Sequence, residues 1–308
     1  MVTVRDLQLP DGRTLRVHDG GEGGADATGA SGSSALTVLW HHGSPQTGAP
    51  LEPLLTAAAA RGIRLLSYGR PSYGGSSPLP GRTVGSAADD VRHIAEAFGI
   101  ESMAMLGASG GGPHALAAAA ALPDIVVATA TLASLAPYES AAIGSAAAPD
   151  RPGVIRPSPE PDWFAGMATD GASLRAAVEG RVTKERYEES ADFDPSSFIA
   201  RDYAVLGSSW ASLGEDVNVA STAGNEGLID DDLAFVAPWG VDLGSIVTPV
   251  LLVQGGLDRV VPASHADRLL RRIPMAELWL RPDDGHLSVL EAVPVAMDWL
   301  LAASASRP

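Results

Sequence analysis

The sequence predicts an α/β fold, with a mostly parallel sheet of about eight strands flanked by helices and a helical cap inserted in its second half. Short continuous apolar runs alternate with helix-length segments, a pattern typical of strands that are covered on both faces. This alternation stops between residues 137 and 243 and then resumes. We therefore predict a core formed by residues 1–136 and 244–308, and a cap formed by residues 137–243.

The N-terminal region predicts a β-hairpin followed by a loop. Apolar and polar side chains alternate over residues 2–18 on either side of Asp11-Gly12, a dipeptide suited to a tight turn, so we expect two antiparallel strands. Residues 20–34 are nearly all small or polar, and such a segment cannot bury enough apolar surface to order itself. We predict a flexible surface loop there.

The other core elements follow from the apolar runs. Predicted strands cover residues 35–43, 63–69, 102–109, 125–134, 249–258 and 276–282. Predicted helices cover residues 53–61 and 87–98, or begin near residues 110, 262 and 286. A helix between consecutive strands favours βαβ units, and these units form a parallel sheet.

The predicted cap is rich in proline, amphipathic segments and aromatic side chains. The segments SLRAAVEGRV and SSFIARDYAVL have helical character, which predicts a cap built from helices. An aromatic-rich cap above an α/β sheet usually walls a ligand pocket. We therefore expect pocket residues among the cap aromatics, with Trp163, Phe164, Trp210 and Trp239 as the candidates.

Composition excludes several classes of function. Lys and Arg total 21 against 37 Asp and Glu, so the formal net charge is −16, which disfavours nucleic acid as a partner. Without cysteine, the chain has no disulfide, thiolate-bound metal or cysteine nucleophile. The N-terminus lacks a signal-peptide pattern and no apolar stretch of membrane-spanning length stands out, so we expect a cytoplasmic protein without a membrane partner. Lys184 is the only lysine and Ala, Gly and Pro abound, which is typical of GC-rich bacterial genomes.

The pentapeptide Gly107-Ala108-Ser109-Gly110-Gly111 lies where a predicted strand ends and a helix of small residues begins. In this context the serine occupies a strained corner, and its neighbours must be small. The corner also places Ser109 at a helix N-terminus, where unpaired N–H groups favour developing negative charge. Ser109 is therefore a candidate nucleophile.

A serine nucleophile needs an imidazole to accept its proton and a carboxylate to orient that imidazole. Asp258 follows a predicted strand and His286 follows the next one, 28 residues later, so both side chains can meet at the same edge of the sheet. An oxyanion needs two backbone donors, one from the residue after the nucleophile and one from the loop after the third strand. Gly110 and Ser44 are the candidates.

These segments together resemble the α/β-hydrolase superfamily, in its capped branch of esterases, lactonases, proline iminopeptidases and carbon–carbon bond hydrolases. The motifs, in family order, are HHGSP (41–45), RPSYGGSSP (70–78), GASGG (107–111), GGLDRVVP (255–262) and DGH (284–286). The resemblance implies the α/β-hydrolase fold, Ser109 as nucleophile, His286 as general base and acid, Asp258 as its orienting carboxylate, the backbones of Ser44 and Gly110 as oxyanion hole, and no cofactor. The family often has Asp-Arg-Pro-Gly where this chain has residues 69–72 (Gly-Arg-Pro-Ser), which weakens the placement in a subfamily.

The function we expect is hydrolysis of a small to medium hydrophobic carboxylic ester, lactone or thioester through an acyl-enzyme. A proline-iminopeptidase-like aminopeptidase is an alternative, in which carboxylates of residues 186–194 and 226–232 would hold a substrate ammonium group. A non-hydrolytic acyl-transfer or cyclisation catalyst, or a receptor on the same fold, is a further alternative. Glu139 is an alternative to Asp258, because some capped relatives place their carboxylate there. Oligomeric state stays open between monomer and homodimer.

Other polar residues have a structural interpretation. His41, His42 and His114 are expected to support loop or helix backbone, whereas His18, His93 and His265 are expected at the surface. The run 230–232 (Asp-Asp-Asp) is interpreted as a solvated helix start, because it has no second set of metal ligands at a useful spacing. We therefore expect no metal site.

Overall fold

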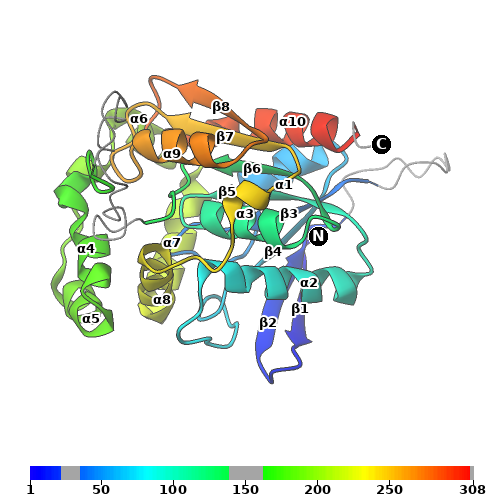
Figure 1. Cartoon of the computed structure of the whole chain (residues 1–308), viewed down its shortest axis with the longest axis horizontal. Coiled ribbons are helices and arrows are strands. Elements are labelled where there is room, and N and C mark those ends of the chain that lie inside the picture. Colours follow the sequence, from blue (N-terminus) through cyan, green and yellow to red (C-terminus); the bar gives the residue numbers. More distant parts are fainter. Residues whose placement is uncertain (22–34, 139–161, 306–308) are drawn as a thin grey trace, which may run out of the picture.

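The computed structural model describes residues 1–21, 35–138 and 162–305. It contains an eight-stranded sheet in the order β1-β2-β4-β3-β5-β6-β7-β8 (Figure 1). The strands are β1 (Thr3–Gln8), β2 (Thr14–Asp19), β3 (Thr37–His41), β4 (Arg64–Tyr68), β5 (Met103–Ala108), β6 (Val126–Leu132), β7 (Val250–Gly255) and β8 (Ala276–Arg281). From β4 to β8 all neighbouring strands are parallel, so the predicted fold class is confirmed.

The N-terminal hairpin is present as predicted. Strands β1 and β2 pair antiparallel up to Gln8 and Thr14, and β2 also pairs antiparallel with β4. Gly12, in the turn, has a φ of +87°, a conformation that glycine adopts without steric cost. Most of the loop predicted at residues 20–34 lies outside the described residues.

The helices of the core cover both faces of the sheet. Helices α1 (Glu52–Ala59) and α10 (Val293–Ala305) pack on one face, and α2 (Ala87–Phe98), α3 (Gly111–Ala121) and α9 (Ser264–Arg272) pack on the other. Successive residues of β3 serve the two faces in turn, with Val38 and Trp40 in one hydrophobic core and Leu39 in the other. Burial on both faces explains why the strands are continuous apolar runs in the sequence.

Between β6 and β7, every element within the described residues is helical. The α-helices are α4 (Ala172–Val178), α5 (Arg181–Ser190), α6 (Ala200–Leu206), α7 (Ala211–Ala223) and α8 (Glu226–Val236). Helices α4 and α5 lie together at one end of the molecule, away from the C-terminus (Figure 1). Residues 139–161 lie outside the described part, so the cap boundaries at 137 and 243 stay a prediction.

One helical stretch has the length and composition of a membrane span, which the sequence analysis did not single out. Residues Ser288–Ala305 have a mean hydropathy of 1.3. This stretch includes α10, whose Val293, Met297 and Leu300 are buried in the hydrophobic core on the face of the sheet that α1 also covers. Its apolar side therefore has a protein partner, as in the core helix of an α/β domain.

Candidate active site

Ser109 occupies a sharp turn between β5 and α3. Its φ is +51°, in the left-handed region that non-glycine residues rarely adopt. A Cβ atom at position 107 would lie 2.6 Å from the carbonyl oxygen of Gly111, and one at position 111 would overlap the carbonyl of His41. The small neighbours that the sequence analysis required are therefore fixed by close backbone contacts.

The structure brings Ser109, His286 and Asp258 together. His286 Nε2 lies 2.9 Å from Ser109 Oγ, and His286 Nδ1 lies 2.8 Å from Asp258 Oδ2. The other carboxylate oxygen of Asp258 accepts hydrogen bonds from the N–H groups of Val260 and Val261, both at 2.8 Å. These bonds fix the carboxylate, so the imidazole that it contacts is directed at Ser109.

Gln254, the residue before the last of β7, contacts Asp258 and its loop, which the sequence analysis missed. Its Nε2 donates to the carbonyl of Val261 at 2.8 Å and to Asp258 Oδ2 at 3.3 Å. The amide therefore supports both the carboxylate and the loop that carries it. A glutamine in an apolar strand is the only signal in the sequence that could have indicated this role.

The pKa of His286 reflects opposing effects. Burial alone lowers the pKa of this imidazole, but the charge of Asp258, the hydrogen bond to it and the more distant charge of Asp202 raise it above the ordinary value of 6.5. The net shift favours the imidazolium form. A carboxylate that stabilises imidazolium makes the neutral ring a stronger base toward the Ser109 hydroxyl.

Ser44 and Gly110 lie beside Ser109. All three residues line the same cavity, and a Cβ atom at position 110 would overlap the Ser44 hydroxyl. Gly110 immediately precedes α3, where backbone N–H groups lack helical partners. The two candidate donors for an oxyanion therefore come from separate loops that meet next to the serine.

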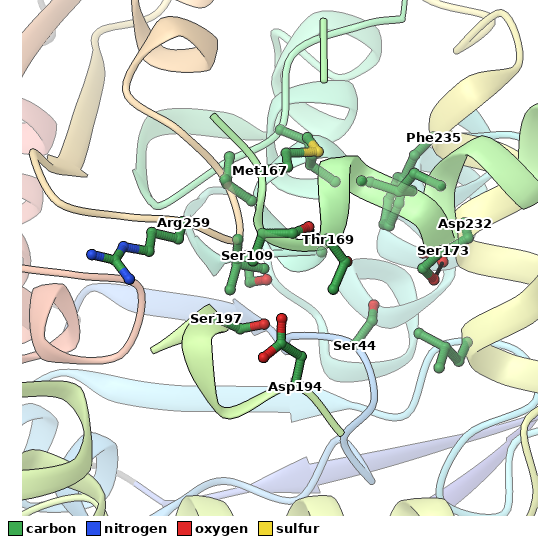
Figure 2. Close-up of a pocket in the computed structure, with 18 of the residues that line it drawn as sticks. Ser44, Ser109, Met167, Thr169, Ser173, Asp194, Ser197, Asp232, Phe235 and Arg259 are labelled. Carbon is green, nitrogen blue, oxygen red and sulfur yellow. Dashed lines mark hydrogen bonds between the residues drawn. The ribbon is translucent and has the colours of Figure 1, made fainter. Parts of the chain in front are cut away.

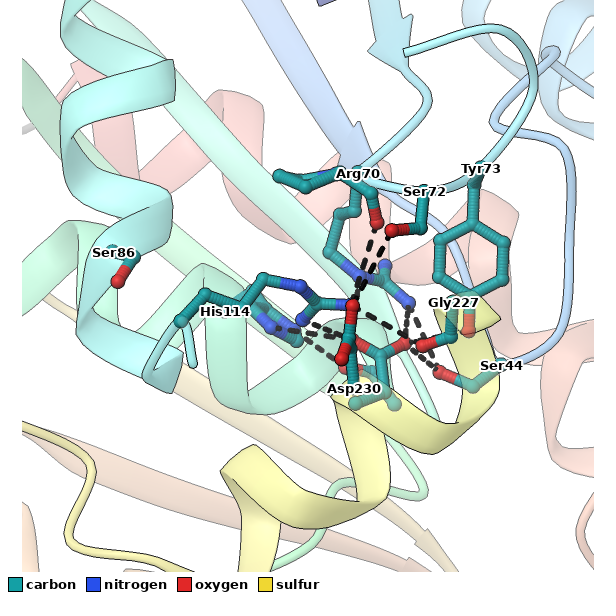
Figure 3. A network of polar contacts seen from close by, with 12 residues as sticks. Ser44, Arg70, Ser72, Tyr73, Ser86, His114, Gly227 and Asp230 are labelled. Carbon is teal, nitrogen blue, oxygen red and sulfur yellow. Dashed lines mark hydrogen bonds and ion pairs between the residues drawn. The ribbon is translucent and has the colours of Figure 1, made fainter. Parts of the chain in front are cut away.

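A buried ionic network lies behind Ser44 (Figure 3). Asp231, on α8, has no exposed surface and pairs with Arg70 at 2.7 Å and Arg82 at 2.6 Å. The hydroxyls of Ser44 and Tyr73 donate to the same carboxylate. Burial alone raises the pKa of Asp231, but the two guanidiniums outweigh it and hold this pKa well below 3.8.

Arg70 also holds the backbone that precedes Ser44. Its guanidinium donates to the carbonyl of His42 and to the Ser44 hydroxyl, the latter at 3.0 Å. The sequence analysis used the 69–72 loop only to place the subfamily and missed this contact. Arg70 thus links the loop after β4, the loop after β3 and the α8 carboxylate at one point.

The prediction that residues 230–232 form a solvated helix start is wrong. All three aspartates are buried inside α8. Asp230 pairs with Arg181, and Asp232 pairs with the buried Lys184 at 2.6 Å. The cationic partners of the three aspartates lie 48 to 161 residues away in the sequence. No local sequence pattern therefore indicates that these negative charges are paired. Within the described residues, no group of three or more His, Asp or Glu side chains could hold a metal ion.

The histidines outside the site are mostly structural, as predicted. His42 Nδ1 lies 2.7 Å from the carbonyl oxygen of Gly43, and His114 Nδ1 lies 2.7 Å from that of Gly110. Burial lowers the pKa of His114 to about 3. His265 corrects the expectation of a surface position, because it is buried and accepts a hydrogen bond from the N–H of Ala136 at 3.1 Å.

Two cavities open onto Ser109 and share Ser44, Ser109 and Val260 in their walls. The larger cavity, of about 400 Å³, is mainly apolar. Its apolar wall includes Trp40, Leu51, Phe198, Trp210, Leu213 and Leu290. The smaller cavity, of about 280 Å³, has more polar groups, including Ser173, Asp192, Asp194, Asp232 and Arg259 (Figure 2).

The structure separates the four aromatic residues predicted to wall the pocket. Trp210 lines the apolar cavity. Trp163, Phe164 and Trp239 line neither of the two cavities described above and are instead buried in the hydrophobic core on the α2 and α3 side. The indole of Trp163 packs edge-on against His265, and its N–H donates to the carbonyl of Ala136 at 3.0 Å. These rings join the segment between β6 and β7 to the core of the sheet.

Residues 37–293 match the family model described as alpha/beta hydrolase fold. The chain belongs to this family. The matched range begins at β3 and ends at the first residue of α10, so it spans the parallel part of the sheet together with the helices inserted between β6 and β7. The resemblance that the motifs indicated is confirmed at the level of the superfamily.

The chain is similar at low sequence identity to the following three proteins. A Synechocystis sp. protein named as a non-heme chloroperoxidase is 24% identical over 255 residues, which cover 81% of this chain and 84% of that protein. An esterase from Thermogutta terrifontis is 19% identical with a TM-score of 0.67 and covers 98% of this chain and 99% of its own. An enol-lactonase from Burkholderia xenovorans is 17% identical with a TM-score of 0.67 and covers 97% and 100%. These structures establish similarity of fold.

Proposed function

We propose that this protein is a serine hydrolase that cleaves a small to medium hydrophobic carboxylic ester, lactone or thioester through an acyl-enzyme intermediate. The observation that carries the proposal is the continuous chain of hydrogen bonds from Ser109 through His286 to Asp258. A serine hydroxyl is a weak nucleophile at neutral pH, and an oriented imidazole within bonding distance is the group that activates it. Membership of the alpha/beta hydrolase fold family supports the same reaction.

In the first half-reaction, Ser109 Oγ bonds to the acyl carbon while its proton passes to His286 Nε2. The carbonyl electron pair moves onto oxygen, where the N–H groups of Ser44 and Gly110 stabilise the charge. The tetrahedral intermediate collapses, the bond to the leaving group breaks, and His286 protonates that group. Water then repeats the sequence, giving its proton to His286 and releasing the acid from Ser109. The cycle needs no cofactor.

The apolar cavity supports a hydrophobic substrate. Its wall combines Trp210 and Leu213 from α7 and the turn before it with Phe198 and Leu290, and His286 also borders it. Burying an apolar group against such a wall is favourable by about 25 cal/mol per Å² of apolar surface removed from water. The acyl or alcohol part that enters this cavity is therefore expected to be aliphatic or aromatic.

Acidic side chains in the smaller cavity favour a second candidate, a proline-iminopeptidase-like aminopeptidase. Asp192 and Asp194 line this cavity, and Asp194 and Ser197 face Ser109 across it (Figure 2). A carboxylate at this position would hold the ammonium group of an aminoacyl substrate. Asp232 contributes less to this role, because its charge is paired with Lys184.

Replacing Ser109 tests the proposal. We expect Ser109→Ala to lower kcat for aryl esters by on the order of 10⁴ to 10⁶, because the nucleophile is lost while the fold is kept. A serine-directed phosphonate should label the parent protein at Ser109 and leave the variant unlabelled, as read by peptide mass spectrometry. An active, unlabelled Ser109→Ala protein would refute the assignment.

A substrate panel separates the alternatives. Aryl esters, lactones and thioesters of increasing chain length are compared with aminoacyl amides under the same conditions. Preference for aminoacyl amides, abolished by Asp194→Asn, would establish the aminopeptidase. Product analysis with an added alcohol or amine distinguishes hydrolysis from acyl transfer, and recovery of a ring product would indicate cyclisation.

A further inference from the structure

One cap residue, Asp202, contacts the segment that carries His286. Asp202 lies on α6 and is 1% exposed. Its Oδ1 accepts hydrogen bonds from the N–H of Leu287 at 3.0 Å, the N–H of Ser288 at 2.7 Å and the Ser288 hydroxyl at 2.7 Å. Leu287 and Ser288 directly follow the imidazole in the chain. A single cap carboxylate therefore holds the backbone next to the proposed base.

The same carboxylate reaches the other side of His286 through Ser288. The Ser288 hydroxyl, which donates to Asp202, accepts a hydrogen bond from the N–H of Gly285 at 2.8 Å. A Cβ atom at position 285 would overlap the Asp202 carboxylate. The glycine before His286 is thus required by the close approach of the cap residue.

Neighbouring residues at the start of α6 contact the same segment. Arg201 pairs with Asp284 and with Glu291, both at 2.7 Å. The Phe198 ring stacks on the His286 imidazole with a centroid distance of 6.4 Å and an interplanar angle of 26°. Residues 198–202, which lead into α6 and form its start, therefore contact the segment from residue 284 to 291 at several points.

Within the described part of the chain, the carboxylates of Asp258, Asp202 and Asp284 belong to the segments that surround the imidazole. Asp258, from the loop after β7, is hydrogen-bonded to the ring itself. Asp202, from α6, is hydrogen-bonded to the backbone that follows His286. Asp284 is already paired with Arg201 and Arg281. Asp202 accepts hydrogen bonds from backbone N–H groups and a hydroxyl, and its carboxylate charge is a smaller contribution, after that of Asp258, to the raised pKa of His286.

We propose that Asp202 is a positioning residue for the reaction, which aligns His286 with Ser109 and adds negative charge near the ring, so that the base is in place only when α6 is docked on the core. The proposal rests on the role proposed for His286. It differs from a purely structural role, because loss of the charge with the shape kept should alter the titration of the imidazole as well as the rate.

The decisive variant is Asp202→Asn, which keeps the size and an accepting oxygen but removes the charge. We expect kcat to fall by on the order of 10-fold to 10²-fold with KM nearly unchanged, because the ground-state pocket is intact while the imidazolium loses a stabilising charge and the hydrogen bonds that hold its backbone lose their charged acceptor. The titration midpoint of His286 should move to lower pH. It is measured by NMR of the imidazole Cε1–H, with the resonance identified by its absence from His286→Gln.

The matched control is Asp216→Asn. Asp216, on α7, also joins the cap to the core through a backbone N–H, that of Thr47 at 3.0 Å, but it does so at the loop after β3. We expect this variant to leave the His286 midpoint unchanged. An Asp202→Asn protein with the parent kcat and midpoint, or with a midpoint that moves no more than that of Asp216→Asn, would overturn the proposal.

The NMR readout and a substitute variant keep the test decisive. The NMR midpoint does not depend on turnover, so it tests the action of Asp202 on His286 even if Ser109→Ala shows that the protein is not a hydrolase. If Asp202→Asn fails to fold, Ser288→Ala replaces it, because this change removes the link to Gly285 and keeps the Asp202 charge. A several-fold loss of kcat with an unchanged midpoint is then expected, and full activity would overturn the proposal.

Discussion

At the scale of single residues, Ser109 shows how local strain serves the site. Its positive φ costs of order 1 to 3 kcal/mol for a non-glycine residue. The cost is offset because the backbone N–H of Ser109 donates to Leu132 on β6 and the turn lies between β5 and α3. In this turn the Ser109 hydroxyl lies 2.9 Å from His286 Nε2.

The pH dependence follows from the raised pKa of His286. The imidazole must be neutral to accept the Ser109 proton, so activity should be full above the pKa and fall as the pH drops through it. Because the pKa is raised above 6.5, half-maximal kcat/KM is expected above pH 6.5. A pH–rate profile with a stable ester checks this value. A profile flat down to about pH 4 would exclude His286 as the base.

Asp258→Asn is expected to keep the fold and lower kcat by on the order of 10⁴, because an amide favours the wrong tautomer of the imidazole. Circular dichroism controls for folding, and ester turnover gives the rate. Unchanged kinetics would move the role to another carboxylate, with Glu139 as the first to test. Glu139 lies outside the described residues, so this variant is the direct comparison.

Some site residues could be predicted from the sequence and others could not. Ser109, Asp258 and His286 each follow an apolar run that forms a strand, so their meeting at one sheet edge follows from topology. Asp231 and Asp202 have no such signal. The partners of Asp231 lie 161 and 149 residues away, and the contacts of Asp202 lie 85 and 86 residues away. Such pairings depend on how the helices between β6 and β7 pack on the rest of the molecule.

At the scale of elements, the ionic network couples α8 to the core. Asp231→Asn leaves two buried guanidiniums without their shared counter-ion, and the free energy of unfolding should fall by about 3 to 5 kcal/mol. Urea denaturation measures the change. The exposed Asp192→Asn is the control, with an expected effect within about 0.5 kcal/mol.

The pH window of this contribution follows from the lowered pKa of Asp231. The carboxylate is stabilised in the folded protein, so its contribution is present above its ordinary pKa of 3.8 and is lost only as the pH falls through the lower folded value. The difference between the parent and Asp231→Asn should therefore be constant from pH 7 to pH 5. A difference that vanished by pH 5 would contradict the assignment.

The helices and strands of the core were predictable because apolar runs, which become buried strands, alternate along the chain with helix-length segments. Helix α2 has the predicted bounds, and α1 and α9 begin within two residues of the predicted positions. The aromatic residues of the insertion were harder to interpret. Trp163, Phe164 and Trp239 pack inward in the cap and core interface, whereas Trp210 borders a cavity. An aromatic residue fits a buried core and a cavity wall equally well, so only the three-dimensional packing shows which of the two positions each ring occupies.

At the scale of the whole molecule, the charge determines which partners are repelled. With a net charge of −16, the protein should show no binding to duplex DNA or to anionic lipid vesicles, even at low salt where electrostatic interactions are least screened. Fluorescence anisotropy and vesicle co-sedimentation check this. Saturable binding that weakens as salt is added would reveal a basic surface that the total charge conceals.

The two cavities that meet at Ser109 have a consequence for the order of events during turnover. Under the proposed mechanism, a substrate cleaved at Ser109 with one part in each cavity would be divided between the apolar cavity and the more polar one. Where the leaving group occupies the more polar cavity, its release would empty that cavity while the acyl group stays bonded to Ser109. The attacking water would then reach the acyl-enzyme along the route by which the leaving group departed.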